Sequence, residues 1–168
     1  MNIRYKLTSQ NLTTHNGFKI PLEGWFYPED RTSKPKPCTN TVLHHYADPH
    51  LAILFNPRHA NFNNPRMFEI EIDEEIGTDE LKGWCRAQRI IREIPVPIIT
   101  TKQRVAFAIY CAEPFGNDKW QKWAADWMSG VVGCCVGAAN AAAYAAVNAA
   151  NKRKHKPDFL AIVKKVFY

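Results

Sequence analysis

The chain has 168 residues, of which 46% are hydrophobic and 23% are charged, and its net charge is +6. This composition excludes a chain that is disordered throughout, and the length can bury a core without metal or disulfide staples. The moderate positive charge permits nucleic acid or an acidic protein as partner and requires neither. Five irregularly spaced cysteines and an N-terminus without the apolar core of a signal peptide predict reduced thiols in the cytoplasm.

The first part of the chain carries strand and turn patterns. Residues 3–7 alternate, which predicts a half-buried strand with Ile3, Tyr5 and Leu7 on its apolar face. Asn16-Gly17 predicts a hairpin turn, after which residues 18–20 and 24–27 form short apolar pieces. Residues 28–37 are rich in proline and charge, so we expect an exposed loop there.

A strand, a short helix and further strands follow. Residues 41–46 are rich in strand-forming residues, and Asp48-Pro49 predicts the cap of a helix over residues 50–55 that ends before Asn56-Pro57. Residues 67–73 alternate cleanly, which predicts a strand whose carboxylates face out. We expect an acidic connector at residues 74–83 and a strand at residues 84–94, with a boundary at about residue 99.

The rest of the chain predicts helices. Residues 102–112 are expected to form a helix capped by Thr100-Thr101, and Trp120, Trp123 and Trp127 fall on one face of the next. Residues 129–151 are uncharged and rich in alanine, and we interpret them as a buried helix that packs against this tryptophan face. The run has the length of a membrane span, but its asparagines and glycines and its lack of Leu, Ile and Phe favour a soluble core.

These patterns together predict an α+β protein. A mostly antiparallel sheet with a short helix is expected over residues 1–99, and a helical lobe around the buried alanine-rich helix over residues 100–168. The last helix is expected to restart at Pro157. We expect the two lobes to form one compact unit without any membrane contact.

Candidates for chemistry gather around residues 38–59. The cysteine and histidines there match no zinc spacing, so we expect neither a metal nor a cofactor. His44, His45 and Tyr46 are the candidate catalytic residues, and a pairing of Cys38 with His44 as nucleophile and base stays open. Adjacent histidines in a strand point to opposite faces, so one of them is expected to be core-facing and hydrogen-bonded. Without a recognisable catalytic motif, the chain favours binding over catalysis.

Two basic groups are candidates for binding a protein partner or nucleic acid. They consist of Lys152, Arg153, Lys154 and Lys156, and of Arg86, Arg89 and Arg92. The alternative for the first group is a set of solvated cations at a helix C-terminus.

Three resemblances add to this interpretation. THNGFKIPLEGWFY, LHHYADPHLAILFNPRHANFNNPRMFEIEI and IPVPIITTKQRVAFAIYCAE resemble a group of uncharacterised phage and prophage proteins with alanine-rich tails. TTKQRVAFAIYCAE with the two helices after it resembles the helical part of bacterial toxin-immunity proteins. The order of strand, capped helix and strand over residues 42–73 is similar to a segment of ADP-ribosyltransferase-like folds. Their signature of an arginine, Ser-Thr-Ser and Glu-x-Glu is not reproduced in order here. Glu69-Ile70-Glu71 has the Glu-x-Glu spacing, but it alternates with core residues on a strand instead of lying in a turn.

The phage-like resemblance implies a small accessory protein in the host cytoplasm. We expect it to act by binding a host protein or ribonucleoprotein, such as a CRISPR complex of a host defence system. The alternatives are an ADP-ribosyltransferase-like enzyme with a pocket near His44 and Tyr46, and a nucleic-acid-binding protein. A helix face of small residues also suits self-association, so a homodimer is a further expectation.

Overall fold

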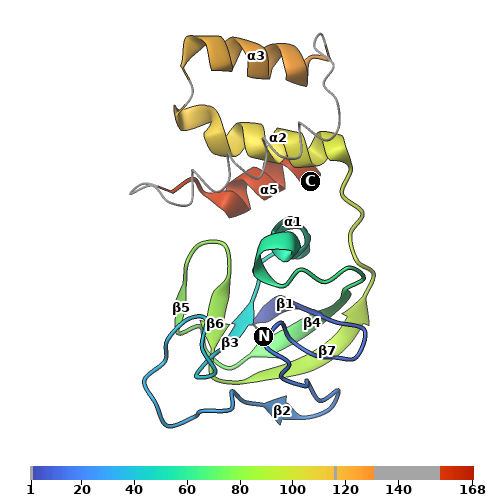
Figure 1. Cartoon of the computed structure of the whole chain (residues 1–168), viewed down its shortest axis with the longest axis vertical. Helices are drawn as coiled ribbons and strands as arrows, with labels where there is room; N and C mark the ends of the chain where they lie inside the picture. The colour runs from blue at the N-terminus through green and yellow to red at the C-terminus, as the bar shows by residue number, and fades with distance from the viewer. Residues whose placement is uncertain (1, 116, 131–155) are drawn as a thin grey trace. The chain divides into compact units, whose positions relative to one another are not determined.

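The computed structural model describes residues 2–115, 117–130 and 156–168 (Figure 1). Contacts divide the chain into two compact units, Met1–Ile98 and Ile99–Tyr168, and each is described by itself below. The first unit contains antiparallel sheets and a short helix, and the second contains helices that pack together. The predicted α+β class is therefore confirmed.

The first unit is a half-barrel of antiparallel strands. Its strands are β1 (Ile3–Thr8), β2 (Trp25–Phe26), β3 (Leu43–His45), β4 (Arg66–Ile72), β5 (Gly77–Thr78), β6 (Gly83–Cys85) and β7 (Gln88–Ile94). One sheet has the order β1-β4-β7-β2 and the other the order β3-β6-β5. The backbones of Tyr5 and Tyr46 exchange two hydrogen bonds of 2.9 and 2.8 Å, so β1 and the end of β3 form a seam between the two sheets.

The strand β1 forms where it is predicted, but the expected burial of Ile3, Tyr5 and Leu7 is only partly right. Ile3 is 41% exposed, Tyr5 is half-buried, and only the second half of the strand, Lys6–Thr8, is fully buried. Lys6 lies opposite Phe68 of β4, and Arg4 lies opposite Ile70. Directly opposed residues share a face, so Lys6 points toward the apolar cluster inside the half-barrel, to which Phe68 and Ile70 belong. Only 5% of Lys6 is exposed. The apolar alternation of residues 3–7 does not reveal this buried lysine.

The helix α1 (Pro49–His59) begins at the predicted cap but extends past the predicted end. Asp48 Oδ1 accepts hydrogen bonds from the backbone of His50 and Leu51, as expected for the cap. Pro57 lies in the last turn, where a missing N–H costs one intrahelical hydrogen bond and does not stop the helix. The Asn56 side chain then bonds the backbone N–H and C=O of Phe62 and holds the chain as it leaves the helix. The prediction that Asn56-Pro57 ends the helix is wrong.

The strand predicted over residues 84–94 is two strands in different sheets. β6 pairs with β3, β7 pairs with β4, and residues 86–87 join them. The predicted connector before them contains β5, which pairs with β6.

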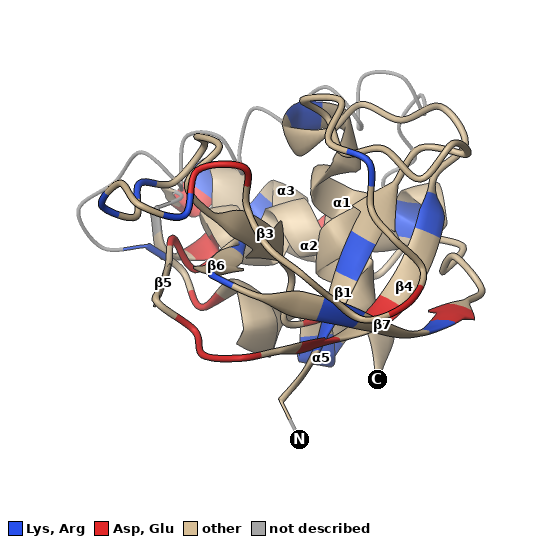
Figure 2. Ribbon diagram, turned by 90° about the horizontal axis from the view of Figure 1, so that it is seen from below, with Lys and Arg blue, Asp and Glu red and all other residues tan. Residues whose placement is uncertain are grey.

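A β-bulge in β7 explains the spacing of its arginines. Glu69 lies opposite Arg92 and Ile70 opposite Ile90, so Ile91 is an extra residue in the ladder. The bulge brings Arg89 and Arg92, three residues apart, to the same face of the sheet. Figure 2 shows acidic and basic segments side by side along β4 and β7.

The second unit contains α2 (Thr101–Ala112), the 3₁₀ helix η1 (Glu113–Phe115), α3 (Asp118–Met128) and α5 (Phe159–Phe167). Thr100 and Gln103 form a capping box that starts α2. Two of the predicted tryptophans, Trp120 and Trp127, pack against Val105 and Ile109 of α2. The alanine-rich helix predicted as their partner lies almost entirely in residues 131–155, outside the described residues. Among the helices that the structure describes, none has the length and apolar character to cross a membrane.

Candidate functional site

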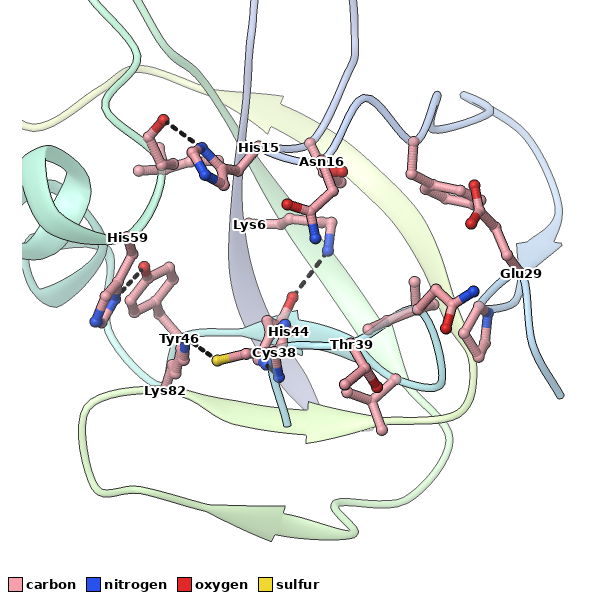
Figure 3. A pocket seen from close by; sticks show the side chains of 18 residues that line it. Lys6, His15, Asn16, Glu29, Cys38, Thr39, His44, Tyr46, His59 and Lys82 are labelled. Atoms are coloured by element: carbon pink, nitrogen blue, oxygen red, sulfur yellow. Dashed lines mark hydrogen bonds between the residues drawn. The ribbon is translucent and has the colours of Figure 1, made fainter. Parts of the chain in front are cut away.

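The first unit contains a pocket of about 370 Å³ beside the seam between its two sheets (Figure 3). Its lining comes from β1, the turn at residues 14–18, the loop at residues 28–42, β3, the end of α1 and the β5–β6 turn. The side chains that carry its chemistry are Lys6, His15, Cys38, His44, Tyr46, His59 and Lys82. Segments far apart in the sequence therefore meet around one cavity.

Lys6 is the most unusual of these residues because it is a buried cation. Its Nζ donates a hydrogen bond of 2.8 Å to the backbone carbonyl of His44 (Figure 3). The two other donors of this ammonium have no partner among the described residues, and none of the described carboxylates forms an ion pair with it. Burial lowers the pKa of Lys6 to about 8, so it is mostly charged at pH 7.

Cys38, His44 and Lys82 form one wall of the pocket. The backbone N–H of Cys38 donates to Nε2 of His44 over 3.2 Å, which holds the loop against β3. Nζ of Lys82 donates to the Cys38 sulfur over 3.4 Å. Cys38 has a φ of 62°, a left-handed conformation that few residues other than glycine adopt and that is found often at functional sites.

The electrostatics of this wall keep His44 neutral. Burial, followed by the nearby charges of Lys82 and Lys6, lowers its pKa to about 4. Because Nε2 accepts a hydrogen bond, the proton of the neutral ring lies on Nδ1. Nε2 is occupied by backbone, so His44 is not placed as a base for the Cys38 thiol, and the pairing left open by the sequence is not formed.

Tyr46 and His59 also line the pocket, and Figure 3 shows Lys82 beside Tyr46. The Tyr46 hydroxyl and Nδ1 of His59 share a hydrogen bond of 2.9 Å, and the two rings stack. Burial lowers the pKa of His59 to about 4 and raises the pKa of Tyr46, so both are neutral at pH 7. Of the described residues that line the pocket, Glu29 alone carries a carboxylate, and it is exposed. Lys6 and Lys82 supply the cations of the lining. The Asp79 carboxylate lies outside the lining but close enough to act on His44, Tyr46 and His59, and it accepts a hydrogen bond from the backbone N–H of Lys82.

The candidate catalytic residues have different positions. His44 and Tyr46 line the pocket, whereas His45 does not. His45 is only 1% exposed, which confirms that one of the two histidines faces the core. Neither of its ring nitrogens has a hydrogen-bond partner in the described structure, so the expected hydrogen bond is absent. Its Nε2 lies 3.7 Å from the Glu75 carboxylate, and burial lowers its pKa to about 3.

The predicted basic groups are engaged within the chain or lie outside the described residues. Arg86 donates to the backbone carbonyls of Arg31 and Ser33. Arg89 pairs with Glu71, and Arg92 pairs with Glu69. Lys152, Arg153 and Lys154 lie outside the described residues, and Lys156 is half-buried. A partner-binding role for these residues stays a prediction.

Sequence patterns alone did not single out Lys6 and Lys82. Lys6 looks like the solvent face of an alternating strand, and Lys82 looks like one more charge in an acidic connector. Among the described residues, no three His, Cys, Asp or Glu side chains gather closely enough to hold a metal ion. In comparisons with protein families, curated proteins and solved structures, nothing matched this chain.

Proposed function

We propose that this protein binds a small anionic ligand whose charged group lies between Lys6 and Lys82. The observation that carries the proposal is the buried ammonium of Lys6, which has no carboxylate partner among the described residues. An unpaired buried charge is costly, and Lys6 is one of the residues that line the cavity. A bound anion would supply both the missing charge and the missing acceptors.

The pocket also restricts the size and the body of the ligand. Its volume of about 370 Å³ is at the lower end of small-molecule sites. Phe18, Val42 and Leu43 contribute apolar walls, and Thr14 and Thr39 contribute hydroxyl groups. We therefore expect a phosphate or carboxylate joined to a compact, partly apolar body such as a ring.

Calorimetric titration of the full chain with three probes tests this proposal. The probes are inorganic phosphate, adenosine, and adenosine monophosphate, which joins a phosphate to a ring system. We expect the monophosphate to bind more tightly than either part, and Lys6→Met to weaken it at least about tenfold, because a charged hydrogen bond is worth about 1.5–3 kcal/mol. Lys19→Met is the matched control, since Lys19 is exposed and lies outside the pocket.

If Lys6→Met and Lys19→Met bind adenosine monophosphate with equal affinity, the proposal is contradicted. It is also contradicted if the chain binds neither adenosine monophosphate nor a compound in which a carboxylate replaces the phosphate on a similar ring. Raising the salt concentration should weaken binding less than it weakens contacts between exposed charges, because Lys6 is buried.

An ADP-ribosyltransferase-like activity is the second candidate. A pocket lies at His44 and Tyr46, where this hypothesis expects one, and its cations suit the diphosphate of NAD. However, Glu69 and Glu71 do not line the pocket and pair with Arg92 and Arg89. This favours binding over transfer. Incubation with labelled NAD and host extract separates the two, because transfer leaves label on a host protein and binding alone does not.

Binding to a host protein stays a prediction, and the structure offers one surface at which it can be tested. Trp25 and Tyr27, in and beside the edge strand β2, are 39% and 40% exposed, and the guanidinium groups of Arg89 and Arg31 lie over their rings. Tryptophan, tyrosine and arginine are the residues that dominate binding energy at interfaces. If a host defence component is recovered with the tagged chain, Trp25→Ala with Tyr27→Ala should reduce its recovery while Lys6→Met leaves it unchanged.

A further inference from the structure

Cys38 differs from the other cysteines that the structure describes. Its sulfur is exposed at the pocket and accepts a hydrogen bond from the Lys82 ammonium. Cys85 and Cys111 are buried, and burial raises the pKa of both thiols, that of Cys85 to about 11. At neutral pH these two stay protonated and out of reach of a reagent. Reaction in the described part of the chain is thus directed to Cys38.

The Cys38 thiol shares its cavity with Lys6, a buried cation whose ammonium bonds only the His44 carbonyl among the described residues. Lys6 and Lys82 lie on the same cavity, so an anion drawn to the ammonium groups arrives beside the sulfur (Figure 3). Cys38 is also fixed in place, since its backbone N–H is bonded to the His44 ring. A fixed sulfur beside a site for anions satisfies the geometric requirement for selective reaction with anionic reagents.

We propose that Cys38 is a nucleophilic thiol that forms a mixed disulfide with small disulfides carrying carboxylates. This inference rests on the proposed anion-binding function. The thiol loses its proton to solvent, and the Cys38 sulfur attacks the nearer sulfur of the reagent. The reagent's S–S bond breaks as the new one forms, and the other half leaves as a thiolate. The small disulfide is the oxidant, so no further redox partner is needed.

The test compares two aromatic disulfides that differ in charge, the dianionic dithiobis(nitrobenzoate) and the neutral dithiodipyridine. Peptide mass spectrometry after acid quenching measures the rate at Cys38 alone, so other cysteines do not interfere. We expect the ratio of anionic to neutral rates to exceed that of free N-acetylcysteine amide, whose thiol stands on an otherwise uncharged molecule, by about fivefold or more, because electrostatic attraction raises encounter rates by about tenfold or more. Lys82→Gln should lower the ratio toward that of the free thiol, and Lys19→Gln should not.

A ratio at Cys38 equal to that of the free thiol would overturn the inference, as would an unchanged ratio in Lys82→Gln. A salt titration of the wild-type chain gives the same information without a substitution, because screening should reduce the ratio. Calorimetry of the same wild-type chain with adenosine monophosphate measures anion binding separately. Anion binding by a wild-type chain whose thiol is unselective would refute this inference alone, whereas absence of anion binding by the wild type would refute the proposed function as well.

Discussion

Replacing Lys6 with methionine should make the protein more stable and less able to bind an anion. Methionine has a similar length and shape but no charge, so it fills the same space inside the half-barrel. The buried ammonium has one hydrogen-bond acceptor and, among the described residues, no ion-pair partner. Its removal therefore deletes a desolvation cost that the folded state bears in the absence of ligand.

The pKa of Lys6 gives the size of this cost. Burial lowers it from 10.5 to about 8, and each pKa unit corresponds to about 1.4 kcal/mol, so the charged form costs about 3 kcal/mol. Loss of the charged hydrogen bond to the His44 carbonyl offsets about 1.5–2 kcal/mol. That carbonyl keeps a donor, because Nε2 of Gln88 bonds it over 3.2 Å. We expect Lys6→Met to raise the free energy of unfolding by about 1 kcal/mol at pH 7.

Urea denaturation at several pH values measures this difference. Between pH 8 and pH 10.5 the unfolded chain holds a proton at Lys6 that the folded chain has lost, so Lys6 makes the wild type more stable as pH rises through this range. The advantage of Lys6→Met should therefore be full below pH 8 and be gone before pH 10.5, where the lost hydrogen bond leaves the variant less stable than the wild type. A destabilised variant at pH 7, or a difference that is constant with pH, would refute the assignment of Lys6 as an unpaired buried cation.

Three further predictions concern stability. A Cβ at Gly83 would overlap Cε1 of His45, so Gly83→Ala should lower the free energy of unfolding in urea by about 1–3 kcal/mol. Adding His45→Ala should restore part of this loss, and independent effects of the two substitutions would contradict the contact. The pKa values of His44, His45 and His59 are lowered from 6.5 to about 4, 3 and 4. The free energy of unfolding should therefore be highest above pH 6.5 and should fall as the pH drops below 6.5, where the unfolded chain binds protons that the folded chain does not. A urea midpoint at pH 5 equal to that at pH 7 would argue against neutral buried rings. Thr100→Ala should cost the second unit about 1 kcal/mol by removing the capping box, while Thr100→Ser should keep most of it; calorimetry that separates the two units measures both.

Local patterns were enough to predict most of the elements. The cap at Asp48 and the alternation of residues 67–73 predicted a helix start and a strand that the structure contains. Both signals depend on neighbours a few residues away. The end of α1 was missed because a proline in the last turn of a helix costs little, which sequence alone does not distinguish from a helix stop.

The candidate site could be predicted only in part. His44 and Tyr46 stood out by residue type, and both line the pocket. Lys6 was missed because the alternation assigned the face of Ile3, Tyr5 and Leu7 to the core. In the structure the face of Lys6 is the one that lies opposite the core residue Phe68, a pairing that sequence alone does not reveal. Lys82 reaches Cys38 across 44 residues of sequence, a proximity created by the pairing of β3 with β6.

The pocket spans the seam between the two sheets of the first unit. Lys6 follows Tyr5 on one side of the seam, and His44 precedes Tyr46 by two residues on the other, so an occupant of the pocket touches both halves. A ligand bound there would stabilise the pairing of the two sheets, because the sheets could separate at the seam only after the ligand is released. The exchange of the Tyr5 and Tyr46 amide protons with solvent should slow when the pocket fills, giving a direct report of occupancy from the backbone itself.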